Sequence, residues 1–223
     1  MKAAKIIGGL LLFAVAVFIV VSIWAAKDKQ DAEARLYAAY ANYVNSLNIG
    51  SADSVSSVQI DSILNPLEKD SDEIEKIVWY SPSLPYSNHK VGCYIARDLQ
   101  AKSLGLRFKI SYISSHPLNI IGYKFQCDTT LYSYNAKVKT KIRDSGLIQE
   151  VSDAYVEAPE YGIIKALANC NSAKIRFLGY DRNEDFVISK EELAAIRDVY
   201  TKFRQAGGKI SIQYSSFKGA LTQ

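Results

Sequence analysis

Hydrophobic and polar positions first divide the 223-residue chain near residue 26. Residues 6–26 are all apolar or small apart from one serine, and 21 helical residues rise roughly 31 Å, which matches the core of a bilayer. Lys27, Asp28 and Lys29 end this run abruptly. The pattern predicts a transmembrane anchor over 1–26, which is alternatively an uncleaved signal.

The rest of the chain divides into three parts. Apolar residues at helical spacing predict an amphipathic helix over 27–50. Residues 51–70 begin with a Ser- and Asp-rich stretch, so we expect a linker that ends in a short buried segment. Residues 71–223 carry the periodicities of a globular domain.

Inside this domain the hydrophobic period changes from 3.6 to 2. A helix is expected to run from Asp70 or Ser71 to Trp79. From Lys90 to Glu157 apolar residues alternate with polar ones and the connections are short, which predicts an antiparallel meander. The strands expected in this meander cover 104–112, 121–127, 132–142 and 147–156.

The last third of the chain predicts an α-β-α-β segment. Its expected elements are a helix after Pro159, a strand over 174–180, a helix closed by Gly207 and Gly208, and a strand over 209–214. Ser189 and Glu192 have the spacing of a capping box at the start of the second helix. Together the elements predict an α+β fold, with helices packed on one face of an antiparallel sheet.

Composition indicates that the domain is folded and nearly neutral. The chain is 48% hydrophobic and 22% charged, which excludes charge-driven disorder. Of its 27 basic side chains, Lys2 and Lys5 belong to the N-terminal segment, which leaves 25 basic against 23 acidic side chains. This balance gives no electrostatic reason to bind a polyanion, so we expect no nucleic-acid partner.

The cysteines and histidines limit the chemistry that we expect. Three cysteines without CxxC spacing indicate neither a disulfide framework nor a zinc site, and at most one internal pair can form. Cys93 with His89 or His116 would make a nucleophile pair. The alternative is that Cys93 is a small buried residue of a strand. The absence of Asn-x-Ser/Thr sequons favours a bacterial envelope.

Oxygen-bearing side chains occur at calcium-loop spacing late in the chain. Positions 1, 3, 5, 7 and 12 of such a loop correspond to Asp181, Asn183, Asp185, Val187 and Glu192. Over about 16 residues this stretch resembles the EF-hand family. The resemblance implies a Ca²⁺ ion held by four side chains and the backbone carbonyl of Val187.

An alternative interpretation needs no metal. Phe186 stands where EF-hands have glycine, and no second loop is present. The same residues would form a polar strand-to-helix turn in which Ser189 and Glu192 cap the helix. Apart from Ca²⁺ we expect no cofactor.

Basic residues are expected to gather on one face of the meander. The set that we expect there is Arg107, Lys109, Lys124, Lys137, Lys139 and Lys141. Such a stripe would meet anionic lipid, glycan or a protein partner. Alternatively, lysines on an exposed strand protect the sheet edge from pairing with other chains.

A second resemblance concerns the layout of the first 48 residues. A basic leader ends in Gly8 and Gly9, and an apolar run then continues into an amphipathic helix before a sheet-containing head. This layout resembles type IV pilin and pseudopilin subunits, which implies a structural subunit. The glutamate that such subunits carry five residues into the mature chain is missing. The later part of the chain also resembles uncharacterised bacterial envelope domains.

The sequence therefore favours binding over catalysis. No P-loop, HExxH or GxSxG motif occurs, and catalytic residue types are scarce. We expect a single-pass membrane protein, held in the membrane by residues 6–26, with the bulk of the chain in the cell envelope. Its function would be non-catalytic binding of an unknown protein or envelope partner. A calcium-binding module and a pilin-like subunit are the alternatives.

Overall fold

The computed structural model describes residues 27, 29–48, 54–83 and 89–210, with the side chains of residues 89 and 90 excepted. The chain divides into two compact units, residues 1–46 with 214–223 and residues 47–213. A helix over residues 29–47 fills most of the described part of the first unit. The anchor expected over 1–26 lies outside the described residues, and within them no helix is long and apolar enough to cross a membrane.

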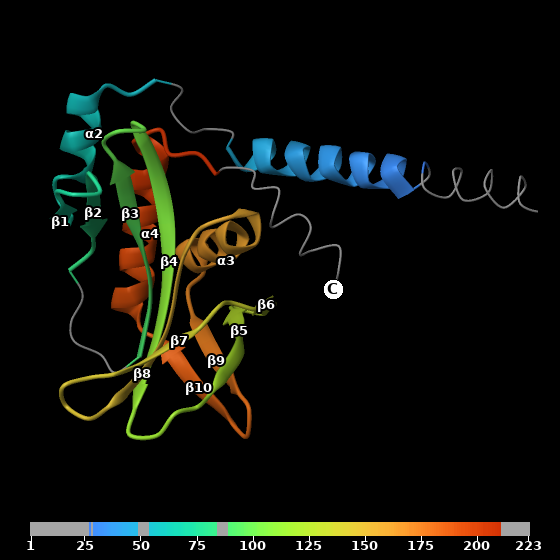
Figure 1. The fold of residues 1–223 in the computed structure, drawn as a ribbon, viewed down its shortest axis with the longest axis vertical. Coiled ribbons are helices and arrows are strands. Elements are labelled where there is room, and N and C mark those ends of the chain that lie inside the picture. Colours follow the sequence, from blue (N-terminus) through green and yellow to red (C-terminus); the bar gives the residue numbers. More distant parts are fainter. Residues whose placement is uncertain (1–26, 28, 49–53, 84–88, 211–223) are drawn as a thin grey trace, which may run out of the picture. The chain divides into compact units, whose positions relative to one another are not determined.

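The second unit is an α+β domain with antiparallel sheets. Its helices are α2 (Ser57–Leu64), α3 (Ala158–Asn169) and α4 (Lys190–Gln205). Its six-stranded sheet has the order β1 (Glu68–Asp72), β2 (Ile77–Ser81), β3 (His89–Asp98), β4 (Ser103–Ser114), β8 (Ile148–Tyr155) and β7 (Lys139–Ile142). Its four-stranded sheet has the order β10 (Asn183–Ile188), β9 (Ala173–Gly179), β5 (Ile120–Cys127) and β6 (Thr130–Tyr134). Figure 1 shows α4 running along β3 and β4.

The main core lies between the two sheets. The predicted alternation of β4 is confirmed, because Leu106, Phe108, Ile110 and Tyr112 are all buried. The ring of Phe108 lies 6.0 Å from that of Phe125 on β5, centroid to centroid. The ring of Tyr112 lies 5.4 Å from that of Phe177 on β9. Aromatic contacts therefore join the inward face of the six-stranded sheet to the four-stranded sheet.

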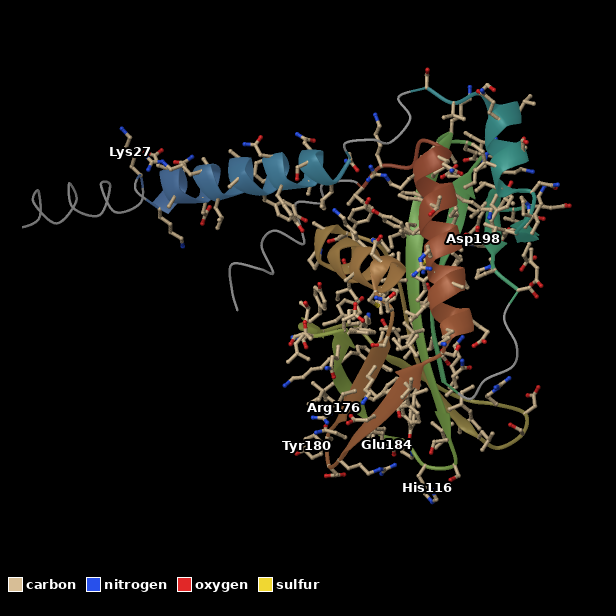
Figure 2. The ribbon with its side chains drawn as sticks, turned by 180° about the vertical axis from the view of Figure 1, so that it is seen from behind. Lys27, His116, Arg176, Tyr180, Glu184 and Asp198 are labelled. Atoms are coloured by element: carbon tan, nitrogen blue, oxygen red, sulfur yellow. The ribbon has the colours of Figure 1, made fainter. Side chains whose placement is uncertain are left out.

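Helix α4 covers another part of the same inward face. The predicted capping box is confirmed, since Ser189 Oγ accepts the backbone N–H of Glu192 and the Glu192 carboxylate accepts that of Ser189. The apolar stripe of the helix is buried: Leu193, Ile196, Val199 and Phe203. Figure 2, seen from behind, shows α4 along the strands, with Asp198 on it. Gly207 ends the helix with a φ of 80°, as glycine caps commonly do.

Gly208→Ala is expected to lower the melting temperature of the full chain. An added Cβ would lie 2.2 Å from Cε2 of Phe203, a buried core residue. Such overpacking costs about 1 to 3 kcal/mol, which corresponds to about 2 to 12 °C in a domain of this size. Gly92→Ala is the control, because its Cβ would meet nothing within 4 Å. Equal melting temperatures for the two variants would contradict the tight packing of Gly208.

The helix expected from residue 70 to residue 79 is wrong. These residues belong to the hairpin of β1 and β2. The Asp72 carboxylate accepts the backbone N–H groups of Ile74 and Glu75, at 2.8 and 2.9 Å, and Lys76 has a φ of 58°. These features close a tight turn, and Ile74 is 90% exposed at its tip. The i, i+3, i+4 spacing of Ile74, Ile77 and Val78, on which the expected helix depended, was therefore accidental.

The expected linker over 51–70 contains regular structure. Ser56 and Gln59 form a capping box that starts α2, and Glu68 starts β1. The short buried segment is confirmed only in part, because Leu64 and Leu67 are buried, Ile60 and Ile63 are half-buried, and Val58 is 79% exposed. The Ser-x-x-Gln spacing of the cap was the signal that could have identified this helix.

The expected meander and α-β-α-β segment differ from the structure in strand pairing. The single strand expected over 132–142 is two strands, of which β6 joins the four-stranded sheet and β7 the six-stranded sheet. The C-terminal segment reads α3, β9, β10 and α4, because residues 183–188 form a strand that we did not expect. Residues 209 and 210 of the last expected strand are not in a strand, and the rest lie outside the described residues.

Candidate functional site

The candidate functional site lies on the face of the six-stranded sheet that points away from the core. Residues paired across antiparallel strands point to the same face. Tyr94 on β3 pairs with Arg107 on β4, and Lys109 pairs with Asp153 on β8. Trp79 on β2 alternates with the buried residues of its strand and lies on this same face. We call this surface the open face.

A hollow of about 560 Å³ lies on the open face. Its lining comes from five strands and two connections: Glu68, Asp70, Trp79, Ser81, Pro82, Gly92, Cys93, Tyr94, Lys109, Ser111, Ile113, Arg143 and Gln149. Gly92 leaves open space in the hollow because it has no side chain. No atom lies within 4 Å of where its Cβ would be. The volume falls in the range of small-ligand sites.

Opposite charges line opposite sides of this hollow. Glu68 and Asp70 lie on the edge strand β1, whereas Lys109 lies on β4 and Arg143 follows β7. Three strand spacings separate β1 from β4, which is about 14 Å. Within the described part of the chain, none of these four side chains forms an ion pair. The partly exposed aromatic rings of Trp79 and Tyr94 lie between the two charged sides.

Side-chain hydrogen bonds connect β3, β4 and β8 at the rim of the hollow. The Tyr94 hydroxyl donates to the Asp153 carboxylate at 2.9 Å, and Arg107 Nε donates to the same carboxylate at 2.9 Å. The Arg107 guanidinium also lies 4.5 Å from the centroid of the Tyr155 ring. Burial raises the pKa of Tyr94, and the negative charge of Asp153 raises it further. The hydroxyl therefore stays protonated and keeps donating.

Only some of the six basic residues that were expected to share a face do so in the structure. Four of its residues share the open face: Arg107, Lys109, Lys139 and Lys141. Lys124 lies on β5 in the other sheet, and Lys137 lies in the connection between β6 and β7. Of the six, only Lys109 lines the hollow. The acidic residues and Trp79 were missed because their segment was assigned to a linker and a helix.

The expected calcium loop is a hairpin and a helix cap in the structure. Asn183, Asp185 and Val187 alternate on β10, which pairs with β9. The Asp185 carboxylate accepts two hydrogen bonds of 2.6 Å from Arg176, and these hold its pKa below the usual range. The Phe186 ring lies 5.4 Å from that of Phe177, so the residue at the glycine position packs against the core.

The carboxylate of Glu192 is also engaged in hydrogen bonds within the protein. Its carboxylate accepts the backbone N–H of Ser189 at 2.9 Å and that of Val91 on β3 at 3.1 Å. It therefore caps α4 and ties the helix to the sheet. Across the described ranges, no group of three or more His, Cys, Asp or Glu residues is arranged to hold a metal ion. Calcium binding by Asp181 to Glu192 stays a prediction that this arrangement does not favour.

The expected nucleophile candidates have separate surroundings. Cys93 is buried, and its thiol donates to the backbone carbonyl of Ile196 on α4 at 3.7 Å. Burial raises the pKa of this thiol, which keeps it protonated. His116 is exposed beside Ser115 in the connection between β4 and β5 (Figure 2). The side chain of His89 lies outside the described residues. Cys93 thus has the surroundings of a small core residue.

Comparison with known proteins adds no functional assignment. No protein-family model matches this chain. No curated protein matches it at a significant level. The open face and its hollow are therefore the basis for inferring what the protein does.

Proposed function

We propose that this protein is a membrane-anchored, non-catalytic binding protein whose domain lies in the cell envelope, outside the cytoplasm. The apolar run over 6–26 supports the anchor. The buried, protonated thiol of Cys93 supports a non-catalytic role. The observation that carries the proposal is the hollow on the open face, with acidic side chains on one side and basic side chains on the other.

The occupant that this hollow fits best is an extended peptide segment with a cationic end and an anionic end. The cationic end would face Glu68 and Asp70, and the anionic end would face Lys109. A separation of about 14 Å corresponds to about four extended residues. Trp79 and Tyr94 would pack on the peptide between its ends, since aromatic side chains commonly provide contact area in binding sites.

The binding test uses calorimetry on the full chain in detergent. The probe is the tetrapeptide Lys-Ala-Ala-Glu with free termini, and the comparator is Gln-Ala-Ala-Gln with acetylated and amidated ends. We expect the charged peptide to bind at least about tenfold more tightly, with a preference that falls as salt is added. Equal binding of the two peptides would contradict the charge-based mode of recognition.

Substitutions inside the hollow are expected to weaken the binding of the charged peptide. Trp79→Ala should raise its dissociation constant about tenfold or more, and Lys109→Gln and Asp70→Asn should each raise it about three- to tenfold. Lys124→Gln is the matched control, because Lys124 is an exposed lysine on the four-stranded sheet. An equal effect of Lys124→Gln would move the binding site away from the open face.

The proposed location has its own test. Protease is added to spheroplasts of bacteria that produce the full chain, whose outer layers are opened while the cytoplasmic membrane stays intact, and the domain is detected by antibody. Digestion in spheroplasts, with a cytoplasmic marker protein left intact, supports an envelope location, whereas digestion only after the cytoplasmic membrane is lysed would contradict it. The pilin-like alternative rests on residues that the structure does not describe and stays a prediction.

A further inference from the structure

Two of the three cysteines meet where helix α3 leads into strand β9. Cys127 is the last residue of β5 and pairs with Ala173, the first residue of β9. Cys170 caps the C-terminus of α3, three residues before Ala173. The side chains of Cys127 and Cys170 lie near enough to shift each other's pKa, and the Cys170 thiol donates to the backbone carbonyl of Leu167 at 3.6 Å.

Hydrogen bonds hold the connection after α3 against the end of β5. The Asp128 N–H donates to the carbonyl of Ser172 at 2.9 Å. The Asp128 carboxylate accepts the N–H groups of Asn171 and Ser172, at 3.3 and 3.1 Å. The connection after α3 is therefore held against the end of β5, and the two cysteines cannot separate without breaking these bonds.

The pair lies just beneath the surface. Cys127 and Cys170 are each 5% exposed, but their neighbours Asp128, Asn171 and Ser172 are exposed. A small reagent can reach the pair once these surface residues move slightly. Cys93 differs, because it lies on β3 in the six-stranded sheet, with its thiol under α4.

We propose that Cys127 and Cys170 form an intramolecular disulfide by exchange with an external disulfide, and that Cys93 remains a thiol. One thiolate attacks the external disulfide RSSR and releases RS⁻, which leaves a mixed disulfide on the protein. The second thiolate then attacks the protein sulfur of the mixed disulfide and releases another RS⁻. The protein loses two electrons and two protons, and RSSR is reduced to two RSH.

This inference rests on the proposed location only for the source of the oxidant in cells. Disulfides persist in oxidising compartments such as the bacterial periplasm and are rare in the cytosol. The pairing of the two thiols depends on the fold alone. The two claims can therefore fail separately.

The test of the pairing uses the reduced full chain and oxidised glutathione. After oxidation the protein is denatured without reductant, alkylated and weighed by mass spectrometry. We expect one alkylated cysteine, mapped to Cys93, and a cross-linked peptide that contains Cys127 and Cys170. Three alkylated cysteines, a stable glutathione adduct or a cross-link to Cys93 would overturn the proposal.

Cysteine variants and melting temperatures give further tests of the same pairing. Cys93→Ala should leave no alkylated cysteine after oxidation, whereas Cys127→Ala should form no intramolecular disulfide, with Cys93 alkylated and Cys170 either alkylated or carrying glutathione. The oxidised wild type should melt about 5 to 10 °C higher than the reduced protein, because the cross-link closes a long loop, and Cys127→Ala should show no such difference. Burial raises the pKa of the Cys127 thiol to about 12, so oxidation should be faster at pH 9 than at pH 7.

Thiols trapped in living cells separate the two claims. Cells are treated with N-ethylmaleimide before lysis, and the chain is then weighed. A disulfide that is present at that moment supports both the pairing and the envelope location. Free thiols in cells, together with disulfide formation in the purified protein, would leave the pairing standing and contradict the location.

Discussion

Replacing Phe108 with alanine is expected to lower the free energy of unfolding by about 3 to 5 kcal/mol. The side chain is 1% exposed and lies between the two sheets. Its ring lies 6.0 Å from that of Phe125 and 5.8 Å from that of Tyr134, centroid to centroid. Alanine would remove these contacts and leave a cavity that the paired strands on both sides cannot fill by moving.

Urea unfolding of the full chain, followed by circular dichroism, measures this loss. Lys109→Ala is the matched control, because Lys109 is the next residue of β4 and is exposed on the open face. We expect it to change the free energy of unfolding by less than about 0.5 kcal/mol. A loss below about 1 kcal/mol for Phe108→Ala would mean that the sheets are not packed together at this point.

The features that could be predicted from the sequence are local ones. The alternation of Leu106, Phe108 and Ile110 specifies one buried face wherever β4 is placed, because successive side chains of a strand point to opposite sides. The cap formed by Ser189 and Glu192 involves only one helical turn. Such signals need no knowledge of which strand pairs with which.

The open face could not be predicted because it depends on strand pairing. Asp70 and Lys109 are far apart in sequence, and they line one hollow only because β1, β2, β3 and β4 lie in that order. Lys124 and Lys139 have the same kind of alternating neighbours, yet their strands belong to different sheets. Strand alternation identifies a face of one strand but not the sheet that contains it.

The calcium motif shows how one pattern arises from two structures. A calcium loop places oxygen ligands at alternate positions because its backbone winds around an ion. An edge strand with one solvated face also alternates polar residues, and Asn183 and Asp185 follow that rule on β10. The pairing of Asp185 with Arg176 on β9 distinguishes the two cases, and it is visible only in the folded chain.

Removing the carboxylate of Glu150 is the second change with a large expected effect. Glu150 lies on β8, is 1% exposed and points toward the core. Its Oε2 accepts the backbone N–H of Leu118 at 2.6 Å, and its Oε1 accepts that of Ile120 at 2.9 Å. The side chain therefore joins the six-stranded sheet to the start of β5 in the four-stranded sheet.

Glu150→Ala is expected to lower the free energy of unfolding by about 2 to 5 kcal/mol, because two buried N–H groups would lose their acceptor. Glu150→Gln has nearly the same shape but keeps only one acceptor oxygen, and its NH₂ group would face an N–H donor. Its loss should therefore fall between those of the wild type and Glu150→Ala in urea unfolding of the full chain. A Gln variant as stable as the wild type would show that one of the two hydrogen bonds adds nothing. Equal losses for Gln and Ala would show instead that the bridge between the sheets needs both oxygens.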